Sequence, residues 1–467
     1  MSSVPSIVPP ADWKRYPYEI PGCDPRMFTF PAAEGDQGSE VHSYLLGAQL
    51  RGTRSGRELA CLVGFACGRV ARGPLPSVRQ DSFLLSLFDL TAGSYGTTSA
   101  IDGPRATPLR RRRMAISEGM LDLRYSTDQG VCRWTGRRDA SGTPSPFHYA
   151  LDLEGMDHNG QGMSASLDVT ATKPPFAVGG SEQGGVVCFE GTSGTHAYTQ
   201  AGLRTRGNLK WGEFDEEVEG DWGWIEHRFS PVHAARLGDR KNLRYHYERC
   251  ALHLDNGWDF TLWSQLDGER GDRKVSFSGV TAQGPEGEVR STTDFQVERL
   301  SFVRDTGVVR PERSVTQTAG YFTDRFHLSV RDWGLSLTAE PHASLGAHAM
   351  PRDYWNGPCR FIGQMAGRPV SGFGFHERSK VWWRPHDLVF VLRETLRHMP
   401  AAAGLGVSPQ TLADRVWQCD VELARGDLQA VRSLLIEQVE PGIKALPASN
   451  REAAAKILED LLATLSK

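Results

Sequence analysis

The chain has 467 residues, 39% of them hydrophobic and 23% charged, with a formal net charge of -3 at pH 7. This length exceeds what one ordinary core holds and predicts two or three domains, while the small net charge excludes bulk attraction to nucleic acid or to an anionic membrane. No stretch approaches the roughly 18–20 apolar residues that span a bilayer, so no integral membrane segment is expected. The 50 glycines, 27 prolines and 12 tryptophans favour short strands and tight turns, and therefore a mainly β protein.

The N-terminal residues show no basic segment followed by an apolar run, so we expect no signal peptide and a cytoplasmic protein. The eight cysteines are scattered, without a CxxC pair or a Cys/His cluster of zinc spacing. Without an export signal, buried free thiols are expected rather than disulfides. The 14 histidines are equally dispersed, and the sequence predicts no metal site.

The first elements in chain order are a lead-in and a series of strands. Residues 1–38 are rich in proline and are expected to form an extended lead-in. From residue 41 to about residue 90, short apolar runs predict strands, and four arginines at 110–113 are interpreted as a solvated loop, with contact to an anionic partner as the alternative. The segment SASLDVTA, 164–171, alternates as a half-buried strand does, and TKPPFAVGG, 172–180, is expected to end it and to act as a hinge.

The stretch GDWGWIEHRF, 220–229, combines aromatic and charged residues in a strand-like pattern. Alternation along a strand would place four of its side chains on one face, namely Trp222, Trp224, Glu226 and Arg228. His227 would lie on the opposite face, beside Ile225 and Phe229. The stretch is therefore either a core strand with an ion pair or an aromatic wall that carries an acid.

A hairpin is predicted over residues 245–268, because Asn256 and Gly257 at its centre both tolerate positive φ. Strand patterns continue to about residue 380, after which the apolar period becomes that of helices. Residues 388–399 are expected to be helical. Ser408 is predicted to cap a further helix with Pro409 at its first position.

The last helix is predicted to begin at a capping box over 449–452. An apolar stripe follows it, formed by Ala454, Ile457, Leu461 and Leu465. No chemistry is evident in this C-terminal segment. Its expected role is packing against the β body or self-association, which leaves a homo-oligomer formed through these helices open.

Five segments occur in an order that resembles the AttH/CrtC superfamily, which includes carotenoid 1,2-hydratases, kievitone-hydratase-like proteins and lipocalin-like Diels–Alderases. In chain order they are LDVTATKPPFAVGG, HAYTQAGLRTRGNLKWGE, VEGDWGWIEHRF, LHLDNGWDFTLWSQLDGE and YWNGPCRFIGQMAGRPVSGFGFHERS. The resemblance covers roughly residues 40–380. The helical tail lies outside it.

The resemblance implies two lipocalin-like antiparallel β-barrel domains with a hydrophobic pocket in or between them, and neither a metal nor an organic cofactor. From this resemblance, the expected domain organisation is a lead-in over 1–38, β domains over 39–190 and 191–385, and a helical extension over 386–467. The implied partner is a hydrophobic small molecule, and no nucleic acid is expected.

The resemblance also suggests which residues form the site. The catalytic candidates are Glu226, His227, Glu377 and Tyr198. The substrate-binding candidates are Trp222, Trp224, Arg228, Tyr354, Trp355, Asn356 and Phe375. Three positions depart from the family pattern, since Glu226 replaces an Asp, Phe229 a Trp and Asn356 a Glu. These departures prevent assignment as a carotenoid hydratase.

Two chemistries and one binding role are compatible with these residues. An acid-initiated hydration, isomerisation or cyclisation of a terpenoid, carotenoid or polyketide-like C=C bond needs a carboxylic acid that burial keeps protonated, and Glu226 among tryptophans fits that need. If Arg228 pairs with Glu226, the acid lies elsewhere. A pericyclic cyclase would instead fold the substrate and polarise a carbonyl. A lipocalin-like carrier of a lipid or pigment would bind without turnover.

Overall fold

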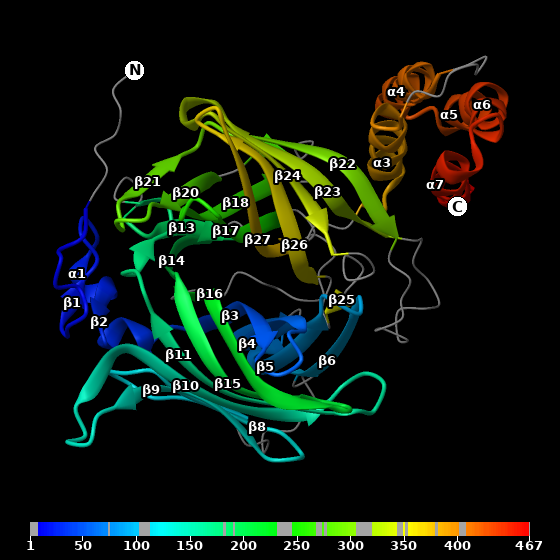
Figure 1. Ribbon diagram of the computed structural model, residues 1–467. Helices are drawn as coiled ribbons and strands as arrows, with labels where there is room; N and C mark the ends of the chain where they lie inside the picture. Colours follow the sequence, from blue (N-terminus) through cyan, green and yellow to red (C-terminus); the bar gives the residue numbers. More distant parts are fainter. Residues whose placement is uncertain are drawn as a thin grey trace.

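The computed structural model describes residues 8–72, 75–101, 113–180, 184–189, 192–230, 245–267, 273–274, 278–304, 320–342, 349–350, 354–378, 382–400 and 408–466. These parts of the chain form two curled antiparallel sheets and a C-terminal group of helices (Figure 1). The mainly β fold with two lipocalin-like units and a helical extension is therefore confirmed. The predicted arginine loop lies, except for Arg113, outside the described residues.

In the first sheet, hydrogen-bonded neighbours follow the order β6-β5-β4-β3-β16-β15-β11-β10-β9-β8-β7. The strands on this path are β3 (Val41–Gly52), β4 (Glu58–Arg72), β5 (Leu75–Asp89), β6 (Ser94–Ile101), β7 (Met114–Ile116), β8 (Asp122–Ser126), β9 (Val131–Arg138), β10 (Pro144–Met156), β11 (Gly162–Ala171), β15 (Leu203–Trp211) and β16 (Phe214–Ser230). β14 (Thr192–Ala201) pairs with β16 and with the short strands β12 (Phe176–Ala177) and β13 (Val186–Phe189).

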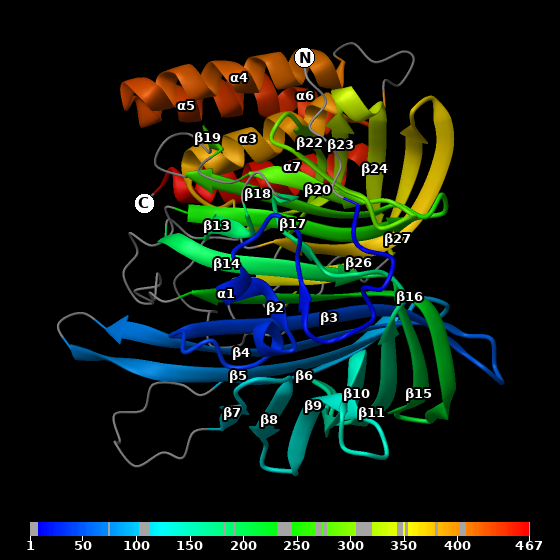
Figure 2. The same ribbon diagram turned by 90° about the vertical axis from the view of Figure 1, so that its left-hand side faces the viewer.

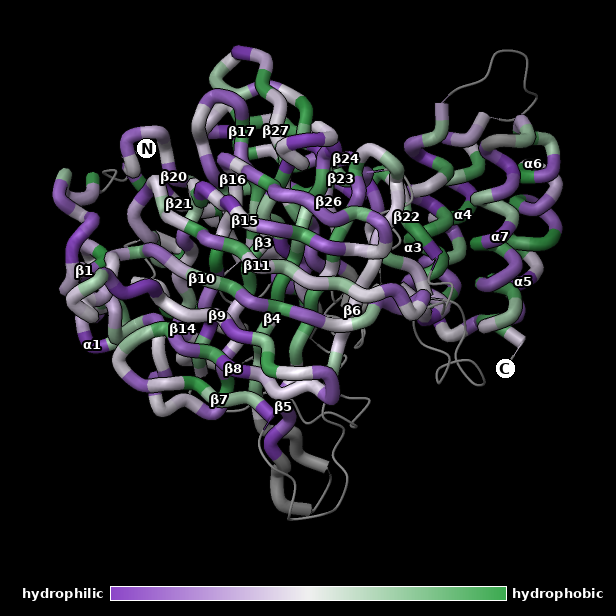
Figure 3. The backbone as a smooth tube through the Cα atoms, turned by 60° about the horizontal axis from the view of Figure 1, so that its bottom comes forward, coloured by the Kyte–Doolittle hydropathy of each residue, from purple (hydrophilic) through white to green (hydrophobic). Residues whose placement is uncertain are grey.

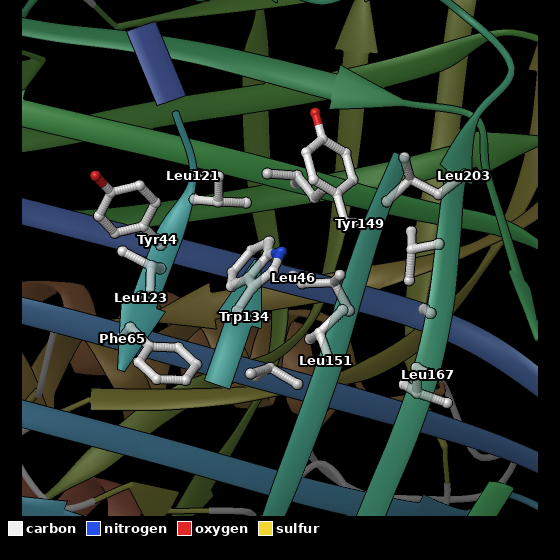
Figure 4. Close-up of a cluster of buried hydrophobic side chains, with 14 of the residues drawn as sticks. Tyr44, Leu46, Phe65, Leu121, Leu123, Trp134, Tyr149, Leu151, Leu167 and Leu203 are labelled. Atoms are coloured by element: carbon white, nitrogen blue, oxygen red, sulfur yellow. The ribbon is translucent and has the colours of Figure 1, made fainter. Parts of the chain in front are cut away.

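The hollow of the first sheet is filled by side chains. Trp134, Leu151 and Leu167 meet Tyr44 and Leu46 there, and each of these residues is at most 2% exposed (Figure 4). The predicted alternation of β11 is confirmed, because its apolar positions from 165 to 171 are buried in this core. Figure 3 shows the same alternation of hydrophilic and hydrophobic residues along other strands.

In the second sheet the order is β21-β20-β18-β17-β27-β26-β24-β23-β22, with β19 beside β18 and β25 beside β26. The strands are β17 (Tyr245–Leu254), β18 (Asp259–Asp267), β19 (Arg273–Lys274), β20 (Gly279–Gln283), β21 (Val289–Thr292), β22 (Gln296–Arg304), β23 (Tyr321–Val330), β24 (Leu335–Pro341), β25 (Ala349–Met350), β26 (Tyr354–Met365) and β27 (Arg368–Arg378). The predicted hairpin joins β17 to β18, and Gly257 in its turn has φ of +83°.

Residues 192–230 belong to a different sheet from the one expected. These residues were expected in the second β domain, but β14 and β16 hydrogen-bond within the first sheet, and β16 pairs with β3 from Val41 to Gly52. The reason is long-range pairing, because β3 is the partner that closes β16 into the sheet and nothing in the local sequence of β16 identifies it. The first sheet thus extends to Ser230, and the second begins at Tyr245. We propose that the domain boundary follows these sheets.

The lead-in forms short elements instead of one extended segment. They are β1 (Tyr18–Glu19), α1 (Pro25–Phe28), β2 (Thr29–Phe30) and the 3-10 turn η1 (Ala32–Glu34). Tyr18, Phe28 and Phe30 are buried in the core of the first sheet. The lead-in therefore helps to build that core. Seven cysteines with described side chains are free thiols, six of them buried.

The C-terminal helices lie beside the second sheet, on the side away from the first sheet (Figure 2). They are α3 (Pro385–Arg397), α4 (Pro409–Arg425), α5 (Leu428–Leu434), the π-helical turn η7 (Leu435–Val439), α6 (Glu440–Lys444) and α7 (Ala448–Thr464). In the described residues, no helix is both long and apolar enough to cross a membrane.

All three predicted helices are present, and α3 covers most of the predicted range 388–399. The Ser408 side chain accepts a hydrogen bond from the Thr411 amide, with Pro409 at the first position of α4, and the apolar stripe of α7 is buried. The predicted capping box is wrong, because α7 begins at Ala448 with Pro447 as its N-cap, one turn before the position of Glu452. Proline fixes its own φ and favours the first residues of a helix, so it starts α7 earlier than the Ser-Glu pair predicts.

Candidate functional site

The two faces of β16 point to two different parts of the molecule, as the alternation predicted. Trp222 and Trp224 pack against Phe375 of β27 in an apolar layer between the two sheets. Ile225 and His227 point the other way, toward the interior of the first sheet. The layer between the sheets therefore receives the aromatic and charged face of the stretch 220–229.

A cluster of two carboxylates and two guanidiniums lies in this layer. Glu226 Oε2 is 2.8 Å from Arg249 Nη2, and Glu226 Oε1 is 3.2 Å from Arg228 Nε. Glu377 Oε2 is 2.6 Å from Arg249 Nη1, and Glu377 Oε1 is 3.9 Å from Arg228 Nη2. Each of the four residues is at most 8% exposed. We call these four residues the charged cluster. Its formal charges sum to zero.

Strand register explains why these residues meet. Arg249 of β17 lies opposite Glu377 of β27, and Glu377 lies opposite Asn356 of β26. Side chains that are directly opposite on antiparallel strands have Cβ atoms about 4.5–5.5 Å apart on one face of the sheet. Tyr247 precedes Arg249 by two residues on the same face, and its hydroxyl donates to Glu377 Oε1 at 2.8 Å. The second sheet thus supplies a row of polar groups facing Glu226.

Indole rings enclose the cluster, and some of its polar neighbours have no partner. The Arg249 guanidinium carbon is 4.8 Å from the ring centroid of Trp224 and 5.5 Å from that of Trp263. The Trp224 indole N–H and both polar atoms of the Asn356 amide are buried without a hydrogen-bond partner. Buried polar groups without partners cost free energy, so this place favours a ligand with a matching polar group.

The pKa of Glu226 reflects two opposing effects. Burial raises the pKa of this carboxyl to about 6, while the guanidiniums of Arg249 and Arg228 favour its ionised form. At pH 7 the carboxylate therefore predominates. Arg228 pairs with Glu226. As stated in the sequence analysis, this pairing means that a catalytic acid would have to be a residue other than Glu226.

His227 and Tyr198 are not part of the charged cluster. His227 Nδ1 is 3.0 Å from the Ala33 carbonyl oxygen, and its ring stacks on Tyr44 with centroids 3.9 Å apart. Burial lowers the pKa of His227 well below its usual value, so the imidazole is neutral. Tyr198 packs edge-on against Phe30 at 4.9 Å. Both side chains therefore lie in the core of the first sheet, on the far face of β16 from Glu226.

The same core holds a carboxyl that the sequence did not reveal. Glu34 is 2% exposed and accepts hydrogen bonds from the hydroxyls of Tyr149 at 2.6 Å and Tyr16 at 3.3 Å. Burial raises the pKa of Glu34 to about 7. Glu34 lies in the proline-rich lead-in, where no periodic pattern marks a residue as buried.

The remaining predicted residues occupy β26 and β27. Phe375 lies in the layer between the sheets, and the Asn356 side chain is fully buried beside Glu377. Tyr354 and Trp355 belong to β26, while their side chains lie outside the described part of the structure. The signal that could have identified Arg249 is the alternation of YHYERCALHL, which places it on one face with Tyr247.

Among the described residues, no group of three or more His, Cys, Asp and Glu side chains is placed to hold a metal ion. The chain matches no family model and no curated protein sequence.

Solved structures nevertheless share the fold. An AttH-like protein from Nitrosomonas europaea is 16% identical, with a TM-score of 0.53 over 75% of this chain and 96% of that one. Kievitone hydratase from Nectria haematococca is 14% identical, with a TM-score of 0.53 over 78% of this chain and 98% of that one. The order of motifs and the two curled sheets thus lead to the same conclusion: the chain has the AttH-like, two-sheet lipocalin-like fold.

Proposed function

We propose that the chain is a cofactor-independent enzyme that acts on a hydrophobic, unsaturated natural product carrying a carbonyl oxygen, with the charged cluster as its polar site. The substrate class is terpenoid, carotenoid or polyketide-like. One observation carries the proposal: the Trp224 N–H, beside the Arg249 guanidinium, and the Asn356 amide, beside Glu377, are buried and have no hydrogen-bond partner. Such groups fit a substrate oxygen better than they fit a purely structural contact.

The proposed reaction is a cyclisation or isomerisation that a polarised carbonyl accelerates. Trp222, Phe373 and Phe375 form the apolar layer that would hold the unsaturated chain in a reactive conformation. Hydrogen bonds from the Asn356 amide and the Trp224 indole would draw electron density toward the carbonyl oxygen. Arg249, buried and fixed by two carboxylates, would stabilise the negative charge that develops on that oxygen.

Acid-initiated hydration is the second candidate, and the pKa of Glu226 favours it under mildly acidic conditions. Because burial raises that pKa to about 6, a growing fraction of Glu226 carries a proton below pH 6. At pH 7 its ion pairs with Arg228 and Arg249 keep it a carboxylate, which is why carbonyl polarisation is preferred. The two candidates differ in pH dependence, since only the acid mechanism gains rate as the pH falls from 7 to 5.

The test is to incubate the protein at pH 5 and pH 7 with matched polyenes that carry or lack a conjugated ketone, and to analyse products by mass spectrometry. We expect conversion of the ketones alone, and at least a tenfold lower rate for Asn356→Leu. This substitution removes an amide without a partner, so stability should be retained. Thr205→Val is the matched control, because it removes a buried hydroxyl without a partner in the first sheet.

Three results would contradict the proposal. Equal turnover by wild type and Asn356→Leu would mean that the polar site around Asn356 takes no part in the reaction. Turnover of polyenes without a carbonyl, faster at pH 5 and lost in Glu226→Gln, would favour acid-initiated hydration. Saturable binding of every compound without any product would identify a carrier.

A further inference from the structure

His253 and Asp259 form a polar pair at the edge of the layer between the sheets. They lie opposite each other on β17 and β18, and His253 Nδ1 is 2.9 Å from Asp259 Oδ1. His253 shares a face of β17 with Arg249, and its ring centroid is 6.3 Å from that of Trp222 in the first sheet. The His253 side chain is 33% exposed and that of Asp259 is 2% exposed. His253 therefore lies where the apolar layer meets solvent.

The other partners of Asp259 determine which nitrogen of His253 carries a proton. Asp259 Oδ2 is 2.6 Å from Lys173 Nζ, and Asp259 Oδ1 also accepts a hydrogen bond from the Trp222 indole N–H at 3.1 Å. Because a carboxylate that is paired with an ammonium can only accept hydrogen bonds, His253 Nδ1 is the donor in its pair with Asp259. Nε2 of the neutral imidazole then has a lone pair and no proton.

Solvent reaches this lone pair. In the described part of the chain His253 Nε2 makes no hydrogen bond, and it is not one of the buried polar atoms without a partner. Two other imidazoles differ, since His227 Nε2 is 3.2 Å from His42 Nδ1 and His342 Nε2 is buried without a partner. A histidine that a carboxylate holds through Nδ1 and that presents a free Nε2 has the arrangement of a general base.

We propose that His253 is the general base of the reaction proposed above and that Asp259 positions it. The inference rests on the proposed function and narrows it to isomerisation of a conjugated ketone. His253 Nε2 takes a proton from a carbon attached to the conjugated chain, and the electron pair of the broken C–H bond moves through the double bonds to the carbonyl oxygen. The proton then returns to another carbon of the chain, so the product is an isomer and no co-reactant is consumed.

Spacing along β16 indicates which C–H bond is broken. Trp222 and Trp224 lie two residues apart on one face, which separates them by about 7 Å. The Trp222 N–H is bound to Asp259 beside the base, whereas the Trp224 N–H has no partner and is the proposed donor to the carbonyl oxygen. The reacting carbon is therefore several bonds from the oxygen, at the γ position or beyond, where conjugation still makes the proton acidic. A carbon directly next to the carbonyl would lie too close to Trp224.

The experiment is to incubate the full chain in deuterium oxide with α-ionone, a terpenoid ketone whose ring double bond is separated from the enone by one C–H carbon. Removing that γ proton and adding a deuteron at the far carbon of the ring double bond gives β-ionone, which ultraviolet absorption and mass spectrometry detect. We expect conversion by wild type, at least tenfold slower in His253→Gln. The matched control is His148→Gln, which should react as wild type does. His148 is also 33% exposed and lies 2.6 Å from a carboxylate, that of Asp168, but it is on the outer face of β10.

Two further readouts separate proton transfer from a structural role. Free imidazole should restore part of the rate of His253→Ala, because the vacated place is open to solvent. Asp259→Asn should lower kcat for α-ionone and leave KM unchanged, because an amide no longer fixes the tautomer of His253. The proposal is overturned if wild type neither converts α-ionone nor takes up deuterium into it, or if His253→Gln matches wild type. It is also overturned if imidazole restores nothing to a His253→Ala variant that circular dichroism shows to be folded.

The same assay distinguishes this proposal from the proposed function. If Asn356→Leu reacts as fast as wild type while His253→Gln is slow, His253 remains the base and the polar site around Asn356 does not hold the carbonyl. If Asn356→Leu is slow while His253→Gln reacts as wild type does, the proposed function stands and the base is another group.

Discussion

At the scale of single residues, Arg249 is the centre of the buried electrostatics, since it pairs with both Glu226 and Glu377. Arg249→Met would leave two buried carboxylates, Glu226 and Glu377, to share the guanidinium of Arg228. Removing one partner of a buried ion pair typically costs about 3–5 kcal/mol. We therefore expect the free energy of unfolding to fall by about that amount at pH 7, measured by urea denaturation.

A surface pair is the control for this prediction. Arg325 lies 3.0 Å from Glu340, but both side chains are at least 34% exposed. Arg325→Met should change the free energy of unfolding by less than about 1 kcal/mol, as exposed ion pairs do. Equal losses for the two substitutions would mean that burial of the charged cluster adds nothing to its contribution.

Glu34 makes stability depend on pH in a direction opposite to that of a salt-bridged acid. Burial raises its pKa from an ordinary 4.5 to about 7 in the folded chain, so the native state binds more protons than the unfolded state between these values. Stability therefore falls as the pH rises through this window, by on the order of 3 kcal/mol. Glu34→Gln keeps an oxygen that accepts from Tyr149 and abolishes the titration.

The comparison of Glu34→Gln with wild type isolates this effect, because Glu226 and all other groups titrate in both proteins. Urea denaturation at pH 5 and pH 8 should show the variant gaining about 2–3 kcal/mol relative to wild type across the interval. Parallel pH dependences in the two proteins would show that Glu34 titrates normally and is not desolvated.

At the scale of elements, local patterns predicted the strands and turns whose signals are local. The alternation of β16 correctly separated Glu226 from His227, and Gly257 correctly marked the hairpin turn. The patterns could not predict which residues contact each other. Arg249 of the second sheet pairs with Glu226 of the first sheet, and the local sequence of neither strand indicates this contact. Glu34 was missed for a related reason, since a turn in a proline-rich segment has no period from which burial can be predicted.

Strand β3 packs so closely against the second sheet that adding one methyl group at Gly47 tests the contact. A Cβ added at Gly47 would lie 2.7 Å from Trp224 Nε1 and 2.9 Å from the Phe375 ring. Gly47→Ala should therefore push the sheets apart at the aromatic layer and cost about 1–3 kcal/mol, as overpacking does. Urea denaturation gives the loss, and near-ultraviolet circular dichroism should report altered tryptophan packing.

Gly162→Ala is the matched control within the first sheet, because a Cβ there would meet no atom within 4 Å. It should change the free energy of unfolding by less than about 0.5 kcal/mol. If Gly47→Ala proves equally harmless, the two sheets are free to separate at this point and the aromatic layer is not a rigid wall.

At the scale of the whole molecule, the two sheets lie against each other, and the helices lie beside the β22 end of the second sheet (Figure 1). The second sheet contacts the first sheet through Phe375 and the helices through Tyr321 and Trp382, while its other face encloses its own core. The sequence predicted two β units and a helical extension, but it placed β14 to β16 in the wrong sheet, because their partners are distant in the chain. Because the second sheet contacts both the first sheet and the helices, it should be sensitive to loss of either neighbour.

The helical extension is therefore expected to protect the second sheet. Asp460 of α7 binds the Tyr321 hydroxyl at 2.6 Å and the Arg304 guanidinium at 2.8 Å. Deleting residues 385–467 would expose the apolar surface around Phe302 and Tyr321 and leave Arg304 without this partner. We expect the truncated chain to aggregate and to unfold at a lower urea concentration, measured by light scattering and denaturation.

A single substitution separates this covering role from self-association. Asp460→Asn in the full chain weakens the attachment of α7 and keeps the apolar surface covered, so it should lower stability by about 1–3 kcal/mol without aggregation. If instead the truncated chain is a stable monomer and the full chain a dimer by sedimentation, the helices serve assembly. In that case the main role of the helices would be to form a contact between two copies of the chain, and covering the second sheet would be secondary.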